Sequence, residues 1–242
     1  MALSVAVVGS GGRMGSLITR LIADSADLEL HAGVGRDGSL DAIEGADVVI
    51  DVSLPAVSPQ VVDAALDRRI PIVVGTSGWT AERIAPVARR VGEDPELGVL
   101  IIPNFSLGSA LATRFSELAA PHFESIEIIE AHHAGKSDSP SGTAIRTAEL
   151  IGAARADLGP VAAPHVDQRA RGQQVASIPV HSMRMSGVNA RQEVVLGGSG
   201  ETVRIVHETL SEDSYAPGIL LALRSAPATR GLVVGLGALL GL

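Results

Sequence analysis

The chain has 242 residues, of which 46% are apolar and only 2% aromatic, so it is long enough for one large or two small domains with cores of Val, Ile, Leu and Ala. A formal net charge of −8 without any long basic run argues against nucleic-acid binding. The absence of cysteine excludes disulfide bonds, thiolate zinc sites and cysteine nucleophiles.

The first hundred residues alternate short apolar runs with amphipathic segments. The predicted strands, all rich in branched side chains, cover residues 3–8, 28–34, 46–52, 70–74 and 97–102. Helical spacing follows the first strand, and further helices are predicted over residues 55–69 and 80–91. This alternation is typical of a doubly wound parallel sheet, so we expect a Rossmann-like α/β dinucleotide-binding domain over residues 1–104.

The pattern changes after residue 104. Helices are predicted over residues 109–119, 141–156 and 215–224, and a polar segment at 157–176 is typical of a surface loop. Further strands, several joined by glycine-rich turns, are predicted over residues 125–130, 178–185, 190–196 and 203–207. We therefore expect an α+β substrate-binding and oligomerisation domain with a mixed sheet over residues 105–216, followed by a C-terminal segment over residues 217–242.

Nothing in the sequence predicts a signal peptide or a membrane span. The start of the chain lacks a basic region, and the longest apolar stretch, residues 231–242, is about half a membrane span in length. We expect a cytoplasmic protein with no membrane partner.

A glycine-rich turn, Gly9-Ser-Gly-Gly-Arg-Met-Gly15, joins the first predicted strand to the first predicted helix. Glycines let the backbone approach a pyrophosphate, and the helix N-terminus favours its negative charge. The turn therefore predicts dinucleotide binding, with a purely structural turn as the alternative.

The corner after the second strand reads Gly33-Val-Gly-Arg36-Asp37 and lacks the acid that commonly holds the adenosine ribose. Arg36 suits a 2′-phosphate or stacking on adenine, and the alternative is a solvated loop residue. We expect NADPH, NADH or both as cofactor.

Two further loops follow predicted parallel strands, namely Gly75-Thr-Ser-Gly78 and Pro103-Asn-Phe-Ser106. Ligands bind at the carboxyl ends of such strands, so we expect both loops to line the cofactor, although either can be an ordinary turn.

The densest group of chemically active residues is Glu130-Ala-His-His-Ala-Gly-Lys136-Ser-Asp-Ser-Pro-Ser-Gly-Thr-Ala144, between a strand end and a helix start. Backbone N–H groups at Gly142 and Thr143 predict an anion site of carboxylate size. His132 or His133, together with Lys136, is then placed to exchange protons beside the anion.

Lys136 is also the only lysine of the chain. Genomic bias toward arginine is one explanation. The other is that this position needs an amine, because an ammonium can give up a proton and a guanidinium cannot.

Other site classes fit the histidines less well. Zinc is disfavoured because adjacent histidines on an extended segment point to opposite faces and no HExxH pattern is present. A structural loop with an exposed lysine is the remaining alternative. The Tyr-x-x-x-Lys pattern of short-chain dehydrogenases is missing, because Tyr215 has Ile219 at that spacing.

The segment from Glu130 to Ala144 resembles the signature of the 4-hydroxy-tetrahydrodipicolinate reductase family, most closely its short actinobacterial members. The resemblance extends over nearly the whole chain. It includes the motifs GSGGRMG, Asp51-Val-Ser, GTSG, PNFSLG, Gly200-Glu-Thr, His207 and Pro217-Gly218.

The resemblance implies an NAD(P)H-dependent oxidoreductase of diaminopimelate and lysine biosynthesis, with hydride delivered to C4 of a cyclic imine. It implies His132 as the acid/base group, Lys136 as the proton donor to the substrate nitrogen, and His133, Gly142 and Thr143 as substrate-binding residues. The implied cofactor-binding residues are Gly9, Ser10, Gly11, Gly12, Arg13, Met14, Gly75, Thr76, Ser77, Ile102, Pro103, Asn104 and Phe105. It also implies a homotetramer formed through the second domain's sheet, and a C-terminal segment that returns to the nucleotide domain.

The chain departs from the family's pattern at three positions. Gly35 replaces the ribose-binding acid, Glu212 stands where relatives usually have Arg, and Arg191 stands where a His is common. Arg184 and Arg191 are candidates for a replacement cation. The alternatives are a catalytically impaired nucleotide-binding relative of the same fold, or an oxidoreductase acting on a related imine or hydroxy acid.

Overall fold

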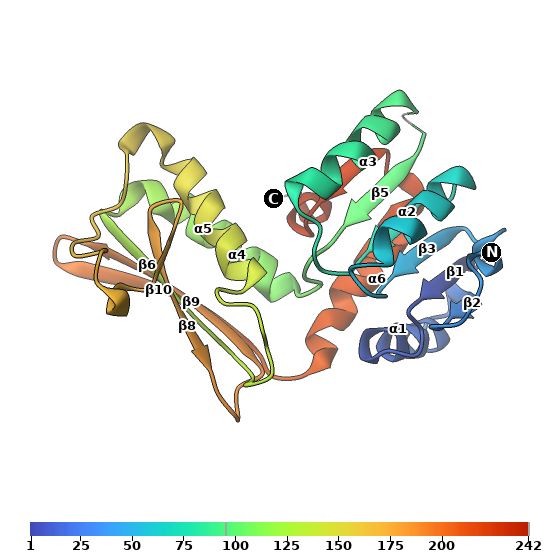
Figure 1. Cartoon of the computed structure of the whole chain (residues 1–242), viewed down its shortest axis with the longest axis horizontal. Coiled ribbons are helices and arrows are strands. Elements are labelled where there is room, and N and C mark those ends of the chain that lie inside the picture. Colours follow the sequence, from blue (N-terminus) through green and yellow to red (C-terminus); the bar gives the residue numbers. More distant parts are fainter. Residues whose placement is uncertain (95, 242) are drawn as a thin grey trace. The chain divides into compact units, whose positions relative to one another are not determined.

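A computed structural model describes residues 1–94 and 96–241, which form two units along the chain (Figure 1). The first unit comprises Met1–Leu107 and Glu212–Leu242, and the second comprises Gly108–Ser211. The chain therefore runs from the first unit into the second, and its C-terminal segment belongs to the first unit again.

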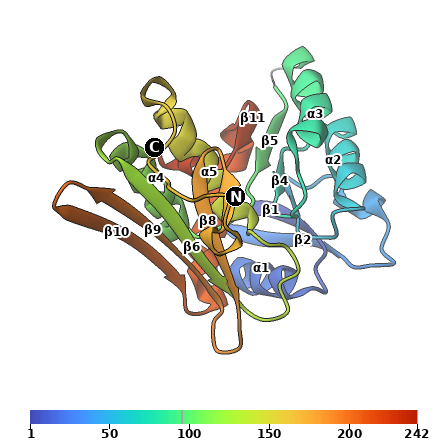
Figure 2. The ribbon, with the colours of Figure 1, turned by 60° about the vertical axis from the view of Figure 1, so that its left-hand side comes forward.

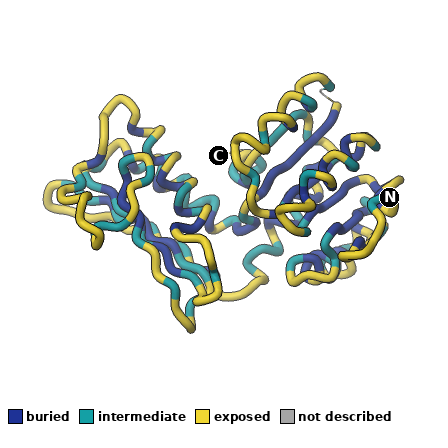
Figure 3. The backbone as a smooth tube through the Cα atoms, viewed as in Figure 1, coloured by how far each residue is buried: buried dark blue, intermediate teal, exposed yellow. Residues whose placement is uncertain are grey.

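The first unit is built on a six-stranded sheet with the order β11-β5-β4-β3-β1-β2, in which every neighbouring pair is parallel. Its strands are β1 (Leu3–Val8), β2 (Leu28–Val34), β3 (Val48–Asp51), β4 (Ile72–Val74), β5 (Gly98–Ile101) and β11 (Gly231–Val234). The central strands are buried on both faces, as their continuous runs of Val and Ile predict, and are dark blue in Figure 3.

Helices cover both faces of this sheet, which confirms the doubly wound class. They are α1 (Arg13–Ala23), α2 (Ser58–Asp67), α3 (Ala81–Glu93) and α6 (Ala216–Ser225). Val61 and Val62 of α2 and Val87 of α3 join one core cluster with the strands, and these two helices lie side by side in Figure 2. Helices α1 and α6 contact each other. All five strands predicted here are present, most of them shorter by a residue or two at one end or both.

The sixth strand was not predicted. The apolar tail contains β11, whose N-terminal residue Gly231 donates its N–H to the carbonyl of Leu97 over 2.8 Å, and which pairs with β5 along its length. Gly98 permits the approach, because a side chain there would collide with the carbonyl oxygen of Thr229.

The second unit contains a five-stranded mixed sheet with the order β10-β9-β6-β8-β7. Its strands are β6 (Ser125–His132), β7 (Gln173–Val175), β8 (Ile178–Arg184), β9 (Ala190–Gly198) and β10 (Glu201–Thr209). The pair β6–β8 is parallel and the other pairs are antiparallel. One of the predicted glycine-rich turns lies between β9 and β10, where Gly200 has a φ of +87°. Strand β7, by contrast, lies in the segment that we expected to be entirely loop.

Helices α4 (Leu107–Ala119) and α5 (Gly142–Ala154) accompany this sheet. Ala144, Ala148 and Ile151 of α5 pack on strand residues such as Ile128 and Val194 in a single core cluster. Ser141 caps α5, since its hydroxyl accepts the N–H of Ala144 over 3.2 Å. The loop from β6 to α5 is thereby held at its α5 end.

Within the described part of the chain, no helix combines the length and the apolar character that crossing a membrane requires.

Candidate active site

The glycine-rich turn of the first unit is sterically closed to larger side chains at two positions. Gly9 has a φ of +90°, and a Cβ there would lie 2.6 Å from the carbonyl oxygen of Val52. A Cβ at Gly15 would collide with the carbonyl oxygen of Gly9. The turn therefore folds tightly against the end of β3 and the start of α1.

Helix α1 begins immediately behind this turn. Its N-cap is Gly12, and no side chain caps it. The first N–H groups of a helix have no acceptor within the helix and favour an anion. The turn and helix end fit the pyrophosphate of a dinucleotide.

The other predicted cofactor loops lie at the same edge of the sheet. Val8 is paired with Asp51, Asp51 with Val74, and Val74 with Ile101, so the segments that follow β1, β4 and β5 leave the sheet at one level. The loops that carry Gly75, Thr76 and Ser77 and Ile102, Pro103, Asn104 and Phe105 thus lie at the same edge of the sheet as the glycine-rich turn.

Phe105 locks these loops together. A Cβ at Gly75 would lie 2.5 Å from the Phe105 ring, and a side chain at Gly218 of α6 would collide with the Phe105 carbonyl oxygen. Phe105 is buried, with its ring against Gly75 and its backbone carbonyl against Gly218. This contact explains why glycine is found at both positions.

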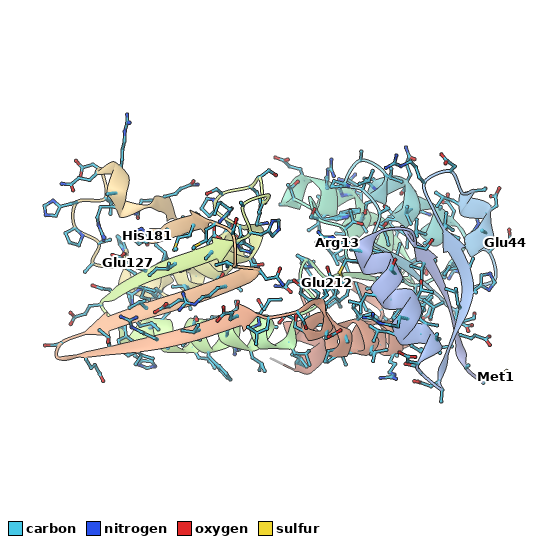
Figure 4. The ribbon with its side chains drawn as sticks, turned by 90° about the horizontal axis from the view of Figure 1, so that it is seen from below. Met1, Arg13, Glu44, Glu127, His181 and Glu212 are labelled. Atoms are coloured by element: carbon cyan, nitrogen blue, oxygen red, sulfur yellow. The ribbon has the colours of Figure 1, made fainter. Side chains whose placement is uncertain are left out.

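Arg36 is exposed two residues after the end of β2, at the same edge of the sheet. Arg13, in the first turn of α1, lies 3.7 Å from the carboxylate of Glu212 in the short helix Glu212–Tyr215 (Figure 4). The two side chains are 84% and 46% exposed, so this ion pair contributes little to stability.

The predicted chemical group lies in the second unit, between the end of β6 and the start of α5. His132 is the last residue of β6 and is half-buried, whereas His133, the next residue, is exposed. Nδ1 of His132 lies 2.6 Å from Oε2 of Glu130, whose side chain is completely buried. The other ring nitrogen of His132 therefore remains the one that can act on a ligand.

Lys136 is half-buried in the loop that follows. Its ammonium lies 2.7 Å from Oδ1 of Asp138, and the backbone N–H of Gly142 is near enough to the same carboxylate to help lower its pKa. Burial opposes ionisation of Asp138, but the hydrogen bond and charge of Lys136 outweigh it, so its pKa is lowered. The start of α5 and the lysine thus already bind one carboxylate together, which fits the predicted anion site.

Glu130 is the centre of a network that sequence reasoning missed. Arg184 of β8 donates through both terminal nitrogens, each 2.9 Å from a different Glu130 oxygen. The N–H of Ser141 donates to Oε1 over 3.2 Å. Burial raises the pKa of Glu130, but hydrogen bonds from His132, Arg184 and Ser182 outweigh this and lower it to about 2.

Neither candidate for a replacement cation has an unpaired guanidinium. Arg184 is bound to Glu130, and Arg191 lies 2.6 Å from Glu193, which Arg204 also contacts. Glu193 and Arg191 alternate with Gln192 along β9 and so lie on the other face of the sheet from Glu130.

One further histidine lies on the same face as Glu130. His207 of β10 is paired with Gln192 of β9, which is paired with Glu130 of β6. Burial lowers the pKa of His207, which favours a neutral ring. Among residues 1–94 and 96–241 no group of three or more His, Asp or Glu side chains is arranged to hold a metal ion.

Two family profiles match this chain. The profile described as "Dihydrodipicolinate reductase, N-terminus" matches residues 3–105, and the profile described as "Dihydrodipicolinate reductase, C-terminus" matches residues 108–240. Together they cover both structural units.

Individual relatives agree with the profiles. The chain is 56% identical over 240 residues to 4-hydroxy-tetrahydrodipicolinate reductase of Clavibacter sepedonicus, covering 99% of this chain and 87% of the relative. It is 46% identical to the enzyme of the same name from Streptomyces griseus, covering 97% and 96%. Among solved structures, dipicolinate-bound dihydrodipicolinate reductase from Paenisporosarcina sp. TG-14 matches with a TM-score of 0.83 and 27% identity over 98% of this chain and 99% of that one. On these matches the chain belongs to the dihydrodipicolinate reductase family.

Proposed function

We propose that this chain uses NADPH or NADH to reduce 4-hydroxy-tetrahydrodipicolinate, via dihydrodipicolinate, to tetrahydrodipicolinate in diaminopimelate and lysine biosynthesis. Full-length relatives named for this activity share 46% and 56% of its residues. The observation that carries the proposal is the Lys136–Asp138 pair in the loop between β6 and α5, four residues after His132, which is held by a buried carboxylate.

The first unit binds the cofactor in this proposal. The closed turn at Gly9 and Gly15, the uncapped start of α1 and the loops locked by Phe105 support this role. A bound reduced nicotinamide supplies the hydride. Arg36, exposed after β2, supports binding of the adenosine end, including a 2′-phosphate.

The second unit binds the substrate and transfers the proton. Reduction at C4 of the conjugated cyclic imine leaves electron density on the ring nitrogen, and Lys136 donates a proton there. His132 acts as the acid/base group, because a neutral imidazole with its Nδ1 bound to Glu130 accepts or donates through the other ring nitrogen. General acid help of this kind is worth about 100- to 10,000-fold in rate.

The substrate carries two carboxylates, and we assign one of them to the start of α5. Gly142 and Thr143 offer the N–H groups of the first helical turn, and Lys136 adds a positive charge. His133 is exposed beside this loop and contacts the substrate in this proposal.

We further propose that four copies associate through the open face of the second unit's sheet, and that the enzyme acts in the cytoplasm. One face of this sheet is covered by α5. Met183 and Val206, which alternate with core residues and so lie on the other face, are 47% and 49% exposed. Apolar side chains at this exposure support a contact with another copy.

A coupled assay tests the activity. The substrate is generated in the assay mixture by dihydrodipicolinate synthase from pyruvate and aspartate semialdehyde. Oxidation of NADPH or NADH is followed by absorbance. We expect oxidation that depends on both this chain and the synthase. Absence of oxidation with either cofactor, at concentrations where the cofactor is shown to bind, would contradict the proposed function.

A further inference from the structure

Glu130 is an ionised carboxylate in a completely buried position. It lies on the face of β6 that α5 covers, together with Ile126 and Ile128. A buried charge is costly unless it is paired and its oxygens accept hydrogen bonds. Both conditions are met here. Arg184 pairs with the carboxylate and donates to each oxygen, and His132 and the N–H of Ser141 donate one further hydrogen bond each.

This arrangement determines which nitrogen of His132 carries a proton. An ionised carboxylate only accepts hydrogen bonds, so Nδ1 of His132, 2.6 Å away, must be an N–H. The ring nitrogen on the opposite side is then the one that exchanges a proton. Arg184 keeps Glu130 ionised, because a guanidinium does not give up its proton.

Arg184 also reaches the loop that carries Lys136. Its second terminal nitrogen donates to the backbone carbonyl of Asp138 over 2.6 Å as well as to Glu130. The carboxylate of the same aspartate holds the ammonium of Lys136 at 2.7 Å. One guanidinium therefore connects the histidine side of the site to the lysine side.

We propose that Glu130 and Arg184 are positioning residues, which as a pair fix the proton on Nδ1 of His132 and the loop conformation that places Lys136. This inference rests on the proposed function. Arg184 is the residue that joins both effects, because its planar fork binds two Glu130 oxygens and the Asp138 carbonyl at once.

The same sheet contains a matched control. Glu127, also on β6 but on the opposite face, accepts a hydrogen bond from His181 over 2.8 Å (Figure 4). It is also paired with Arg171. It thus has the same kinds of partner, a histidine and an arginine, without lying on the site's face. Glu127→Gln controls for loss of a paired carboxylate from β6.

The first measurement needs no substrate. Nitrogen NMR of the imidazole rings, assigned with His132→Asn, reports the tautomer of His132 in the full-length protein. We expect the Nδ1–H form in the wild type and in Glu127→Gln, and a mixture of forms in Glu130→Gln. A wild-type His132 in the Nε2–H form would overturn the proposal, whatever the activity of the enzyme.

The second measurement is the pH dependence of turnover in Glu130→Gln and Arg184→Met. Glu130→Gln removes a negative charge beside the imidazole, so the limb of the kcat/KM profile that is due to His132 moves to lower pH. Arg184→Met leaves that charge unneutralised, so the same limb moves to higher pH. We expect kcat to fall about 10- to 100-fold in both variants, with KM and cofactor Kd changed less than about threefold.

Two further variants are compared with these: Arg184→Lys as the conservative replacement and Glu127→Gln as the control. Arg184→Lys keeps the charge but not the fork, so we expect its pH profile to resemble the wild type while kcat stays lowered. We expect Glu127→Gln to match the wild type at equal oligomeric state. Unshifted limbs in both Glu130→Gln and Arg184→Met, in folded protein, would show a structural role only and overturn the proposal.

Discussion

The ammonium of Lys136 lies 2.7 Å from the carboxylate of Asp138, whose pKa the nearby N–H of Gly142 also lowers. Both donors are ones that the proposed function assigns to a substrate carboxylate. If the proposed function is right, Asp138 and a dicarboxylate ligand compete for the same lysine and the same helix end.

Asp138→Asn tests this competition. The substitution removes a negative charge from the site and weakens the contact with Lys136, so we expect pyridine-2,6-dicarboxylate to bind about fivefold more tightly, equivalent to about 1 kcal/mol. Calorimetric titration measures the affinity. Asp157→Asn, an exposed aspartate of the same unit, should bind like the wild type. Weaker binding by Asp138→Asn would mean that Asp138 organises the site and does not compete.

The pKa of Glu130 predicts a pH dependence of stability. Its folded-state pKa of about 2 lies below the ordinary value of 4.5, so its stabilising contribution is present above pH 4.5 and is lost as the pH falls toward 2. Between pH 5 and pH 3 the wild type should lose about 2 kcal/mol more of its free energy of unfolding than Glu130→Gln does.

Urea denaturation followed by far-UV circular dichroism measures this loss. Trp79, the only tryptophan, lies in the first unit, so its fluorescence reports on that unit, whereas circular dichroism reports on both units. Equal losses of stability for the wild type and Glu130→Gln would argue against an ionised, stabilising Glu130.

Two glycines of the glycine-rich turn, Gly11 and Gly15, should respond differently to replacement by alanine. Gly15→Ala forces a methyl group into the carbonyl of Gly9, whereas Gly11 has no atom within 4 Å of an added Cβ. We expect Gly15→Ala to destabilise the first unit by about 1–3 kcal/mol, measured by Trp79 fluorescence in urea. Gly11→Ala should stay within about 0.5 kcal/mol of the wild type but bind the cofactor more weakly. Equal stabilities of the two variants would contradict the packing described here.

Arg36 should distinguish the two cofactors. Arg36→Ala removes the guanidinium proposed to bind the 2′-phosphate, so we expect the Kd for NADPH to rise about tenfold and the Kd for NADH to stay within about twofold. Arg89→Ala on the exposed surface of α3 is the control. A parallel loss of both affinities would favour stacking on adenine, and no change would mean that Arg36 is a solvated loop residue.

The sequence predicted the parts of the fold that depend on local patterns. Runs of Val and Ile predicted the first unit's strands, and the switch from glycines to the apolar spacing of Leu17 and Ile18 predicted the start of α1. Strand β11 was missed because its four residues lie in a uniformly apolar, glycine-rich tail, and only pairing with β5 makes them a strand.

The candidate site was predicted only where its residues belong to one local sequence motif. His132, Lys136, Gly142 and Thr143 are close in sequence, so one motif contains them. Arg184 is 54 residues from Glu130, and the two meet only because the parallel pairing of β6 and β8 places Arg184 opposite His132. Side-chain partners that depend on strand register cannot be read from composition or spacing.

In the proposed function the second unit supplies its proton through the amine of Lys136, and the turnover of Lys136→Ala and Lys136→Arg tests this role most directly. We predict that kcat falls by about 100- to 10,000-fold in both variants while the Kd for NADPH is unchanged, since arginine keeps the charge but does not release a proton. Near wild-type kcat in either folded variant would contradict the claim.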